Sequence, residues 1–319
     1  MGNMYSQIYP PKSLFTVDQI PDLTGQVIIV TGGNSGIGKE TCKALLNKNA
    51  KVYLAARSKS KADEAIEWLK RETNGKVPIF LELDLANLSS VRKAAEAFKS
   101  QEQELHVLFN NAGVMRVPVE QRTEDGYDLQ FGTNVLGHYF FTTLLLPTLI
   151  HTAKNSPQAH GHARIINTSS SAVYLVPKGG IVWETLGTDE ASVQACKELG
   201  SNKLYAQSKL GNVLFSNELA KHYADQGIMS SSLNPGSIQT ELQRHLPWLV
   251  RVIIGLLFHH HASYGALTQL WSGTMPEGRE HSGEFLIPWA RVGDPGQYGH
   301  DEKLAGRLWA WLEEQVKGH

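Results

Sequence analysis

The chain has 319 residues, of which 41% are hydrophobic and 19% charged. These proportions are typical of a globular protein with a sizeable core, and they exclude a disordered, collagen-like or coiled-coil chain. The 30 basic and 31 acidic residues give a net charge of -1, so no excess of positive charge favours nucleic-acid binding. Two cysteines, Cys42 and Cys196, do not make a disulfide framework in a chain of this length, which indicates a reducing, cytoplasmic compartment.

The N-terminal residues 1–22 are polar and contain three prolines, without the apolar run of a secretion signal. The longest apolar stretch elsewhere covers residues 246–258. Its 13 residues are interrupted by Arg251 and are too few to span a bilayer. We therefore expect a soluble protein with an N-terminal extension over residues 1–22. Peripheral contact of residues 246–258 with a membrane surface remains an open alternative.

Short runs rich in β-branched residues alternate with amphipathic stretches along most of the chain. Such alternation predicts right-handed crossovers and a parallel sheet that is covered on both faces. We therefore predict an α/β protein with one Rossmann-type, doubly wound parallel sheet of about seven strands, in a single domain over residues 23–319. The expected strands cover residues 26–31, 51–56, 77–82, 106–110, 164–168, 229–234 and 284–287. The expected helices cover residues 36–46, 61–71, 89–100 and 205–223, with a long helix after Asn134.

A glycine-rich turn follows the first expected strand. Its glycines are spaced G-x-x-x-G-x-G, between a strand and a helix. Glycine permits positive φ and lets a pyrophosphate approach the backbone at a helix N-terminus, where free N–H groups and the helix dipole favour anions. An ordinary glycine-rich turn is the alternative, but the strand before it and the helix after it favour a dinucleotide site. The expected contacts are Gly32, Asn34, Ser35, Gly36, Ile37 and Gly38.

Arg57 and Ser58 follow the second expected strand. A site for NAD would place Asp or Glu there to bind the ribose 2′-hydroxyl. A guanidinium instead suits a 2′-phosphate, which it can bind through two hydrogen bonds. The sequence therefore predicts that NADPH/NADP+ is preferred over NADH, with Lys39 as a further positive charge. A surface arginine at a strand end and an exposed lysine in the first helical turn are the alternatives.

Five further motifs follow the glycine turn in a fixed order. They are Asn110-Asn111-Ala112-Gly113, Asn134, residues 167–170, Tyr205-Ala-Gln-Ser-Lys209 and Asn234-Pro235-Gly236. In that order they resemble the short-chain dehydrogenase/reductase family, over about residues 23–240 with weaker similarity to residue 292. Residues 123–127 and 131–139 resemble the retinol dehydrogenase-like and WW-domain oxidoreductase-like branch. Residues 286–293 resemble fungal members.

Tyr205 and Lys209 are four residues apart on an expected helix, so their side chains share one face. The lysine ammonium is expected to lower the phenol pKa toward working pH, so that Tyr205 exchanges a proton with the substrate oxygen. The resemblance implies the same role for Tyr205 and adds that Lys209 holds the nicotinamide ribose. It also implies that Ser170 orients the substrate carbonyl and that Asn134 holds a water in a proton relay. The run of three serines leaves the first assignment open by one position, although the motif alignment favours Ser170.

Further cofactor contacts follow from the resemblance alone. Asp84 would lie by the adenine, with Leu85 beside it, although a helix-capping Asp is an equal alternative. Asn111, Ala112 and Gly113 would pass along the cofactor, and Pro235, Gly236 and Thr240 would close over the nicotinamide.

Two segments depart from the short forms of the family. Residues 173–203 form an insert that we expect to loop out, and residues 238–261 are an expected substrate lid with an apolar part over 242–258. Two apolar flaps predict a bulky apolar substrate, although the second could be a homodimer face or a membrane patch. Three consecutive histidines, 259–261, cannot all reach one ion from regular secondary structure, and we expect no metal.

The expected activity is NADPH-dependent reduction of a ketone or aldehyde to the alcohol, or the reverse oxidation. Retinal-like aldehydes, steroid ketones and the polyketide ketones of secondary metabolism all fit an apolar site, and the fold cannot choose among them. Dehydration, epimerisation or C=C reduction on the same fold is one alternative. A non-catalytic, cofactor-binding regulator is the other.

Overall fold

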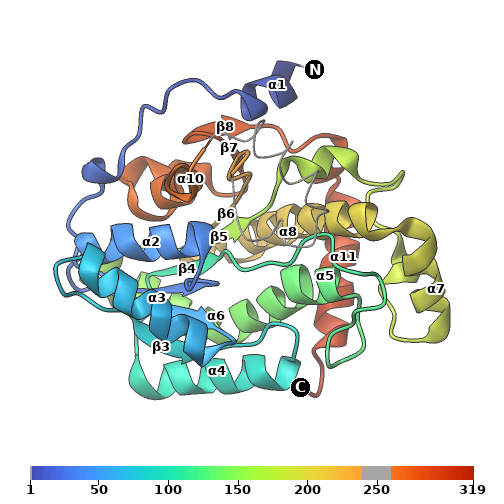
Figure 1. Cartoon of the computed structure of the whole chain (residues 1–319), viewed down its shortest axis with the longest axis horizontal. Coiled ribbons are helices and arrows are strands. Elements are labelled where there is room, and N and C mark those ends of the chain that lie inside the picture. Colours follow the sequence, from blue (N-terminus) through green and yellow to red (C-terminus); the bar gives the residue numbers. More distant parts are fainter. Residues whose placement is uncertain (1, 239–259) are drawn as a thin grey trace.

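The computed structural model describes residues 2–238 and 260–319, with side chains from residue 5 onward. Within that part of the chain, one sheet holds eight strands in the order β3-β2-β1-β4-β5-β6-β7-β8 (Figure 1). The strands are β1 (Val27–Thr31), β2 (Lys51–Ala56), β3 (Ile79–Glu82), β4 (Val107–Asn110), β5 (Ala163–Thr168), β6 (Ile228–Leu233), β7 (Phe285–Ile287) and β8 (Arg291–Gly293). The order reverses direction between β1 and β4, which is where a doubly wound sheet binds its ligand. The predicted fold class is confirmed.

Strand β8 is an addition to the seven expected strands. All other neighbouring pairs are parallel, whereas β8 pairs antiparallel with β7. The connection between them is three residues long, and Ala290 in it has a φ of +53°. A strand of three residues with a partly exposed face carries no alternation for the sequence to reveal, and we therefore missed it.

Two helical layers cover the sheet. Successive strand side chains point to opposite faces, and apolar side chains on both faces need to be buried. Ile28 and Val30 face a core with α2 (Gly36–Asn47), α3 (Lys59–Glu72) and α10 (Ala262–Thr274). Val27 and Ile29 face the other core, with α4 (Leu88–Gln101), α6 (His138–Asn155), α8 (Ser201–Tyr223) and α11 (Glu302–Gln315). Figure 1 shows α2 and α10 on one side of the strands and α4 and α6 on the other. The predicted covering of both faces follows from this alternation.

The segment after β5 contains more regular structure than the predicted loop. Short 3-10 turns, η4 (Ser171–Leu175) and η5 (Trp183–Thr185), lead into helix α7 (Glu190–Leu199), which precedes α8 directly. Asp189 caps α7 by accepting a hydrogen bond from the backbone N–H of Ser192 at 2.9 Å. Such Asx caps satisfy a free N–H at a helix start, so the insert is partly helical.

The N-terminal residues form two short helical segments before β1 and pack against the core. They form helix α1 (Gly2–Ile8) and the turn η1 (Val17–Gln19). Phe15, Ile20 and Leu23 are buried in the core that contains α2 and α10. Among the helices that the structure describes, none is both long and apolar enough to cross a membrane. The apolar stretch 246–258 and nearly all of the expected lid lie outside the described residues.

Candidate active site

A cavity of about 540 Å³ lies beyond the carboxyl ends of the parallel strands. It is formed by the glycine turn, the ends of β2 and β3, the loops after β4, β5 and β6, and one face of α8. The predicted residues that line it are Gly32, Asn34, Ser35, Gly36, Ile37, Gly38, Arg57, Ser58, Asp84, Leu85, Asn111, Ala112, Gly113, Ser170, Tyr205, Lys209, Pro235 and Gly236. Asn134 is buried behind the wall, and Thr240 lies outside the described residues.

The glycine turn is shaped for close backbone approach. Gly32 has a φ of +67° and Gly36 a φ of +50°, which β-carbon-bearing residues rarely adopt. A Cβ on Gly38 would lie 2.3 Å from the backbone oxygen of Gly32 and 2.7 Å from Nδ2 of Asn111. These contacts leave room only for hydrogen at that position. The first residues of α2 therefore line the cavity with their backbone, as a pyrophosphate requires.

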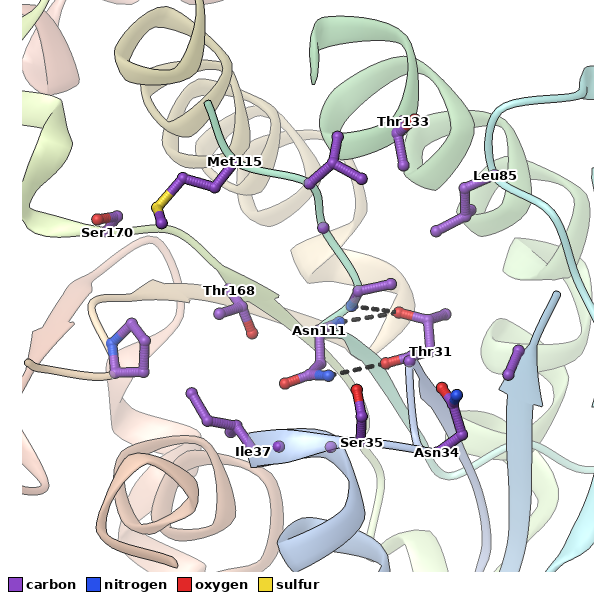
Figure 2. Close-up of a pocket in the computed structure, with 18 of the residues that line it drawn as sticks. Thr31, Asn34, Ser35, Ile37, Leu85, Asn111, Met115, Thr133, Thr168 and Ser170 are labelled. Atoms are coloured by element: carbon purple, nitrogen blue, oxygen red, sulfur yellow. Dashed lines mark hydrogen bonds between the residues drawn. The ribbon is translucent and has the colours of Figure 1, made fainter. Parts of the chain in front are cut away.

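Thr31 joins the glycine turn to the loop after β4. Its Oγ1 accepts hydrogen bonds from the backbone N–H groups of Asn111 and Ala112, both at 2.9 Å (Figure 2). Asn111 Nδ2 in turn donates to the carbonyl oxygen of Thr31 at 2.8 Å. These hydrogen bonds fix the position of the glycine turn relative to the loop after β4. Thr31 was missed from the sequence, although a hydroxyl directly before the glycine turn was a visible signal.

Two exposed cations gather where β2 ends. Arg57 and Ser58 line the cavity as predicted, and Lys61 lines it as well. Ser58 caps α3, since its hydroxyl accepts from the backbone N–H of Lys61 at 3.4 Å. Lys39 is not among the lining residues, and its ammonium lies 4.1 Å from the ring centroid of Trp68. The first turn of α3, rather than that of α2, adds the second positive charge.

Asp84 lines the cavity and also closes a local turn. Its Oδ1 accepts from the backbone N–H of Ala86 at 3.0 Å, an Asx turn. The cap of α4 is Asn87, whose side chain accepts from Ser90 at 2.9 Å. The helix-capping alternative for Asp84 is therefore wrong, and its local bond leaves the side chain at the cavity wall.

Asn134 clamps two walls of the site together. It lies in a π-helical turn, η2 (Gly132–Gly137), a feature that often marks functional sites. Its Oδ1 accepts from the backbone N–H of Val114 at 2.8 Å, and its Nδ2 donates to Val114 O and to Ser208 Oγ, both at 3.0 Å. A Cβ on Gly113 would lie 3.1 Å from the same Oδ1 and 3.5 Å from Nζ of Lys209. The amide thus fixes the loop after β4 against α8.

His138 extends this network behind the cavity. Its Nδ1 lies 3.0 Å from the backbone oxygen of Asn134, and its Nε2 lies 2.9 Å from Oγ1 of Thr31. Because a carbonyl only accepts, Nδ1 carries the proton and Thr31 donates to Nε2 in the neutral ring. Complete burial lowers the pKa of His138 to about 4, so the ring is neutral at physiological pH.

Tyr205, Lys209 and Ser170 meet at the inner end of the cavity. Lys209 is 4% exposed and donates from Nζ to the backbone oxygen of Thr168 at 3.0 Å. Burial lowers its pKa to about 8. Burial likewise raises the pKa of Tyr205 above its ordinary value, while a hydrogen bond with Ser170 and the charge of Arg116 act in the opposite direction. The direction of this shift differs from the expectation that Lys209 lowers the phenol pKa, because desolvation has a larger effect than the bond with Ser170 and the charge of Arg116.

Hydrogen bonds show which serine of residues 169–171 lies next to Tyr205. Ser170 bonds to Tyr205 and also caps η4 by accepting from the backbone N–H of Ala172 at 3.2 Å. Ser169 is 2% exposed, and its hydroxyl donates to the carbonyl oxygen of Lys209 at 2.7 Å. Ser170 is thus the serine that lies at the phenol, as the motif alignment indicated.

None of residues 173–203, the expected insert, is among the residues that line the cavity. Val173 is 3% exposed and packs with Val213, Phe285 and Ile287 beneath the site. Met115 and Ile238 line the cavity, and in Figure 2 the side chain of Met115 points toward Ser170. Met115 directly follows the Asn-Asn-Ala-Gly motif and Val114, which was the signal available in the sequence.

Two of the three consecutive histidines, His260 and His261, lie within the described part of the chain. Among residues 2–238 and 260–319, no three His, Cys, Asp or Glu side chains are grouped to hold an ion. His260 contacts the ring of Trp289 and His261 caps α10, while His259 lies outside this part of the chain. Cys42 and Cys196 are buried free thiols.

Comparison with known proteins identifies the family. A family model for short chain dehydrogenases matches residues 26–182. A short-chain dehydrogenase/reductase of Armillaria gallica is 53% identical over 323 aligned residues, covering 100% of each chain. The chain belongs to the short-chain dehydrogenase/reductase family. A family member from Phomopsis amygdali is 40% identical and covers 99% of this chain and 97% of its own. The resemblance read from the motif order, and its fungal character, are confirmed.

Solved structures share the fold of this chain. A protein from Mycobacterium paratuberculosis is 27% identical, with a TM-score of 0.70 over 95% of this chain and 97% of its own. Pseudomonas aeruginosa RhlG, solved with NADP, shares the fold at 23% identity, a TM-score of 0.63, and coverage of 84% of this chain and 96% of its own. This short-chain dehydrogenase/reductase is an oxidoreductase that uses a nicotinamide cofactor and acts on a small molecule.

Proposed function

We propose that the enzyme reduces the carbonyl of a bulky apolar ketone or aldehyde to the alcohol with NADPH, and can catalyse the reverse oxidation. The observation that carries this proposal is the meeting of Tyr205, Ser170 and Lys209 at the inner end of the cavity that the glycine turn opens. A phenol and a hydroxyl converge there, where a carbonyl oxygen could receive a proton and a hydrogen bond.

The chain's own residues then have distinct tasks. When bound, the cofactor supplies the hydride. Ser170 holds the carbonyl oxygen, and Tyr205 gives it a proton. Burial raises the pKa of Tyr205, so the proton donor is present at neutral pH. Lys209, with a pKa of about 8, holds a proton below that pH and is placed to hold the nicotinamide ribose. Asn134 keeps the loop after β4 and helix α8 at a fixed separation.

The preference for NADPH rests on charge at the end of β2. Arg57 and Lys61 both line the cavity there, together with the hydroxyl of Ser58. Two cations suit a phosphate with its double negative charge far better than a neutral ribose hydroxyl. Backbone at the glycine turn and the loop of Asn111, Ala112 and Gly113 would bind the rest of the cofactor.

An apolar substrate fits the outer part of the site. Met115 and Ile238 line the cavity together with Ser170 and Gly236. Methionine side chains adapt to irregular apolar surfaces, which suits a bulky substrate of varied shape.

The test follows NADPH and NADH oxidation side by side over a panel of apolar aldehydes and ketones, with Tyr205→Phe as the paired variant. We expect NADPH to be consumed with at least one substrate, NADH much more slowly, and the variant to lose turnover while it retains NADPH binding. Binding without turnover on any carbonyl would instead favour a regulator. A product other than an alcohol would favour a different reaction on the same fold.

A further inference from the structure

Gln7, in the N-terminal helix α1, is buried next to Asn234 and Tyr174, in the loops after β6 and β5. It is 1% exposed, whereas Tyr5 and Tyr9 on either side are 68% and 55% exposed. Arg291 fixes the same helix, since its Nη2 donates to the backbone oxygen of Ser6 at 2.8 Å. Figure 1 shows α1 near β8, which is the edge strand of the sheet opposite β3. A polar side chain buried this deeply at the end of a chain requires defined partners.

Those partners form a chain of four hydrogen bonds. The backbone N–H of Gly236 donates to Oδ1 of Asn234 at 3.1 Å. Nδ2 of Asn234 donates to Oε1 of Gln7 at 2.8 Å, and Nε2 of Gln7 donates to the hydroxyl of Tyr174 at 2.8 Å. The hydroxyl of Tyr174 donates to the backbone oxygen of Asp294. Gln7 thus connects residues that are 227 and 167 positions away in the sequence.

The direction of this chain is set at both ends by the backbone. A peptide N–H at Gly236 can only donate, and a peptide oxygen at Asp294 can only accept. The two side-chain amides between them must therefore point their oxygens toward Gly236 and their nitrogens toward Asp294. Each hydrogen bond then strengthens the next, because aligned bonds polarise one another.

Both loops joined by Gln7 border the reacting end of the cavity. Gly236 lines it, with a φ of +89° and room for no Cβ, which would lie 2.9 Å from Pro288 and 3.1 Å from Trp289. Tyr174 lies in η4, the turn capped by Ser170. Asn234 is 3% exposed. Without Gln7, its buried Nδ2 would lose this acceptor, or its amide would turn and release the N–H of Gly236.

We propose that Gln7 is a positioning residue for the nicotinamide half of the cofactor site, acting through Asn234 on the loop of Pro235 and Gly236. This inference rests on the proposed function, which places the nicotinamide at that loop. The N-terminal segment is then a working part of the site, although it lies outside the part of the chain that the family model matches.

The test compares two ligands by isothermal titration. NADPH reaches both halves of the site, whereas adenosine 2′,5′-bisphosphate carries only the adenine half and its 2′-phosphate. Gln7→Met keeps the length of the side chain and removes its polar atoms. We expect the Kd for NADPH to rise about tenfold, the loss for one buried donor left unpaired. The Kd for adenosine 2′,5′-bisphosphate should stay within twofold of wild type, which a general loss of folding would not allow.

Two further variants define the outcome. Gln19→Met is the matched control, because Gln19 is exposed and its side chain accepts only a local bond from the backbone N–H of Thr16; we expect wild-type Kd values for both ligands. Tyr174→Phe keeps the ring and removes the next link, and should weaken NADPH binding in the same direction by a smaller factor.

Three results would overturn the inference. If Gln7→Met binds NADPH as wild type does, or weakens both ligands equally, Gln7 does not position the nicotinamide site. If the wild-type protein binds neither ligand, the proposed function fails and this inference fails with it. If wild type binds both ligands, a negative result for Gln7→Met counts against this inference alone and not against the proposed function.

Discussion

The ammonium nitrogen of Lys209 lies 5.8 Å from the centroid of the Tyr205 ring and donates to the backbone oxygen of Thr168 at 3.0 Å. Desolvation disfavours the charged forms of both side chains. It lowers the pKa of Lys209 to about 8 and raises that of Tyr205. Tyr205 is therefore a phenol at neutral pH, the form that donates a proton to a carbonyl oxygen.

This relationship predicts different pH profiles for the two directions of the reaction. Reduction needs the phenol, so kcat/KM for the carbonyl should be flat between about pH 6 and 8. Oxidation needs the phenolate, so kcat/KM for the alcohol should rise about tenfold per pH unit as the pH approaches the raised pKa of Tyr205. Initial rates in both directions over pH 6–10 check this. An oxidation rate that is independent of pH across this range would show that the phenol of Tyr205 is not the group that titrates.

Cofactor selectivity should depend on Arg57 and Lys61 and not on Lys39. Each of the first two presents its charge to the cavity where a 2′-phosphate would lie, so Arg57→Ala and Lys61→Ala should each raise the KM for NADPH about 10- to 100-fold. The KM for NADH should change little. Lys39→Ala is the matched control, because that ammonium lies over Trp68, and its KM for NADPH should resemble wild type. Equal effects on NADPH and NADH would contradict a 2′-phosphate site.

Site residues whose partners are close in the sequence could be predicted from it. Site residues whose partners are distant in the sequence could not. The glycine turn and the pair Tyr205 and Lys209 are defined by short spacings on one strand–turn–helix unit or one helix. Lys61 was within reach, because it lies one helical turn beyond Arg57. Gln7 was not, because its partners are fixed only by the tertiary fold.

The direction of the Tyr205 pKa shift shows a second limit of prediction from the sequence. A helical spacing of four residues predicts that a lysine and a tyrosine are neighbours, and it does so correctly here. It carries no information about desolvation, which depends on every element packed around the pair. The burial of Val173 against Val213, Phe285 and Ile287 depends in the same way on elements that are distant in the sequence.

Gly38→Ala should weaken cofactor binding strongly while it lowers the stability of the fold only moderately. The added Cβ would lie 2.3 Å from the backbone oxygen of Gly32, so the glycine turn must open and its fit to a pyrophosphate is lost. We expect at least a 100-fold weaker Kd for NADPH and a loss of about 1–3 kcal/mol in the free energy of unfolding. Calorimetry and denaturant unfolding measure the two quantities.

Gly306→Ala serves as the control for that substitution. Gly306 lies within helix α11, and a Cβ there would meet nothing within 4 Å. Replacing an unhindered glycine in a helix with alanine stabilises a protein by about 0.5–1 kcal/mol. We therefore expect a slightly more stable enzyme that binds NADPH as wild type does. Similar losses in both variants would show that the effect at Gly38 is not steric.

Stability in acid should depend on His138. Its folded pKa of about 4 lies below the ordinary value of 6.5, so the unfolded chain takes up a proton at a higher pH than the folded chain does. The free energy of unfolding should therefore fall as the pH drops from 6.5 toward 4, by up to about 1.4 kcal/mol per pH unit from this residue. Above pH 6.5 the contribution is complete and constant.

His138→Gln isolates this contribution, because glutamine can still bond to Asn134 and Thr31 but has no proton to gain. We expect the variant to be less stable than wild type at pH 7 by about 1–2 kcal/mol, since its hydrogen bonds are less well aligned, and to lose less stability between pH 6.5 and 4. The same replacement at the exposed His151 gives the matched comparison and should preserve the wild-type curve. Urea unfolding at half-unit pH intervals measures the three curves. Parallel curves for wild type and His138→Gln would show that the buried imidazole does not set the acid sensitivity of the fold.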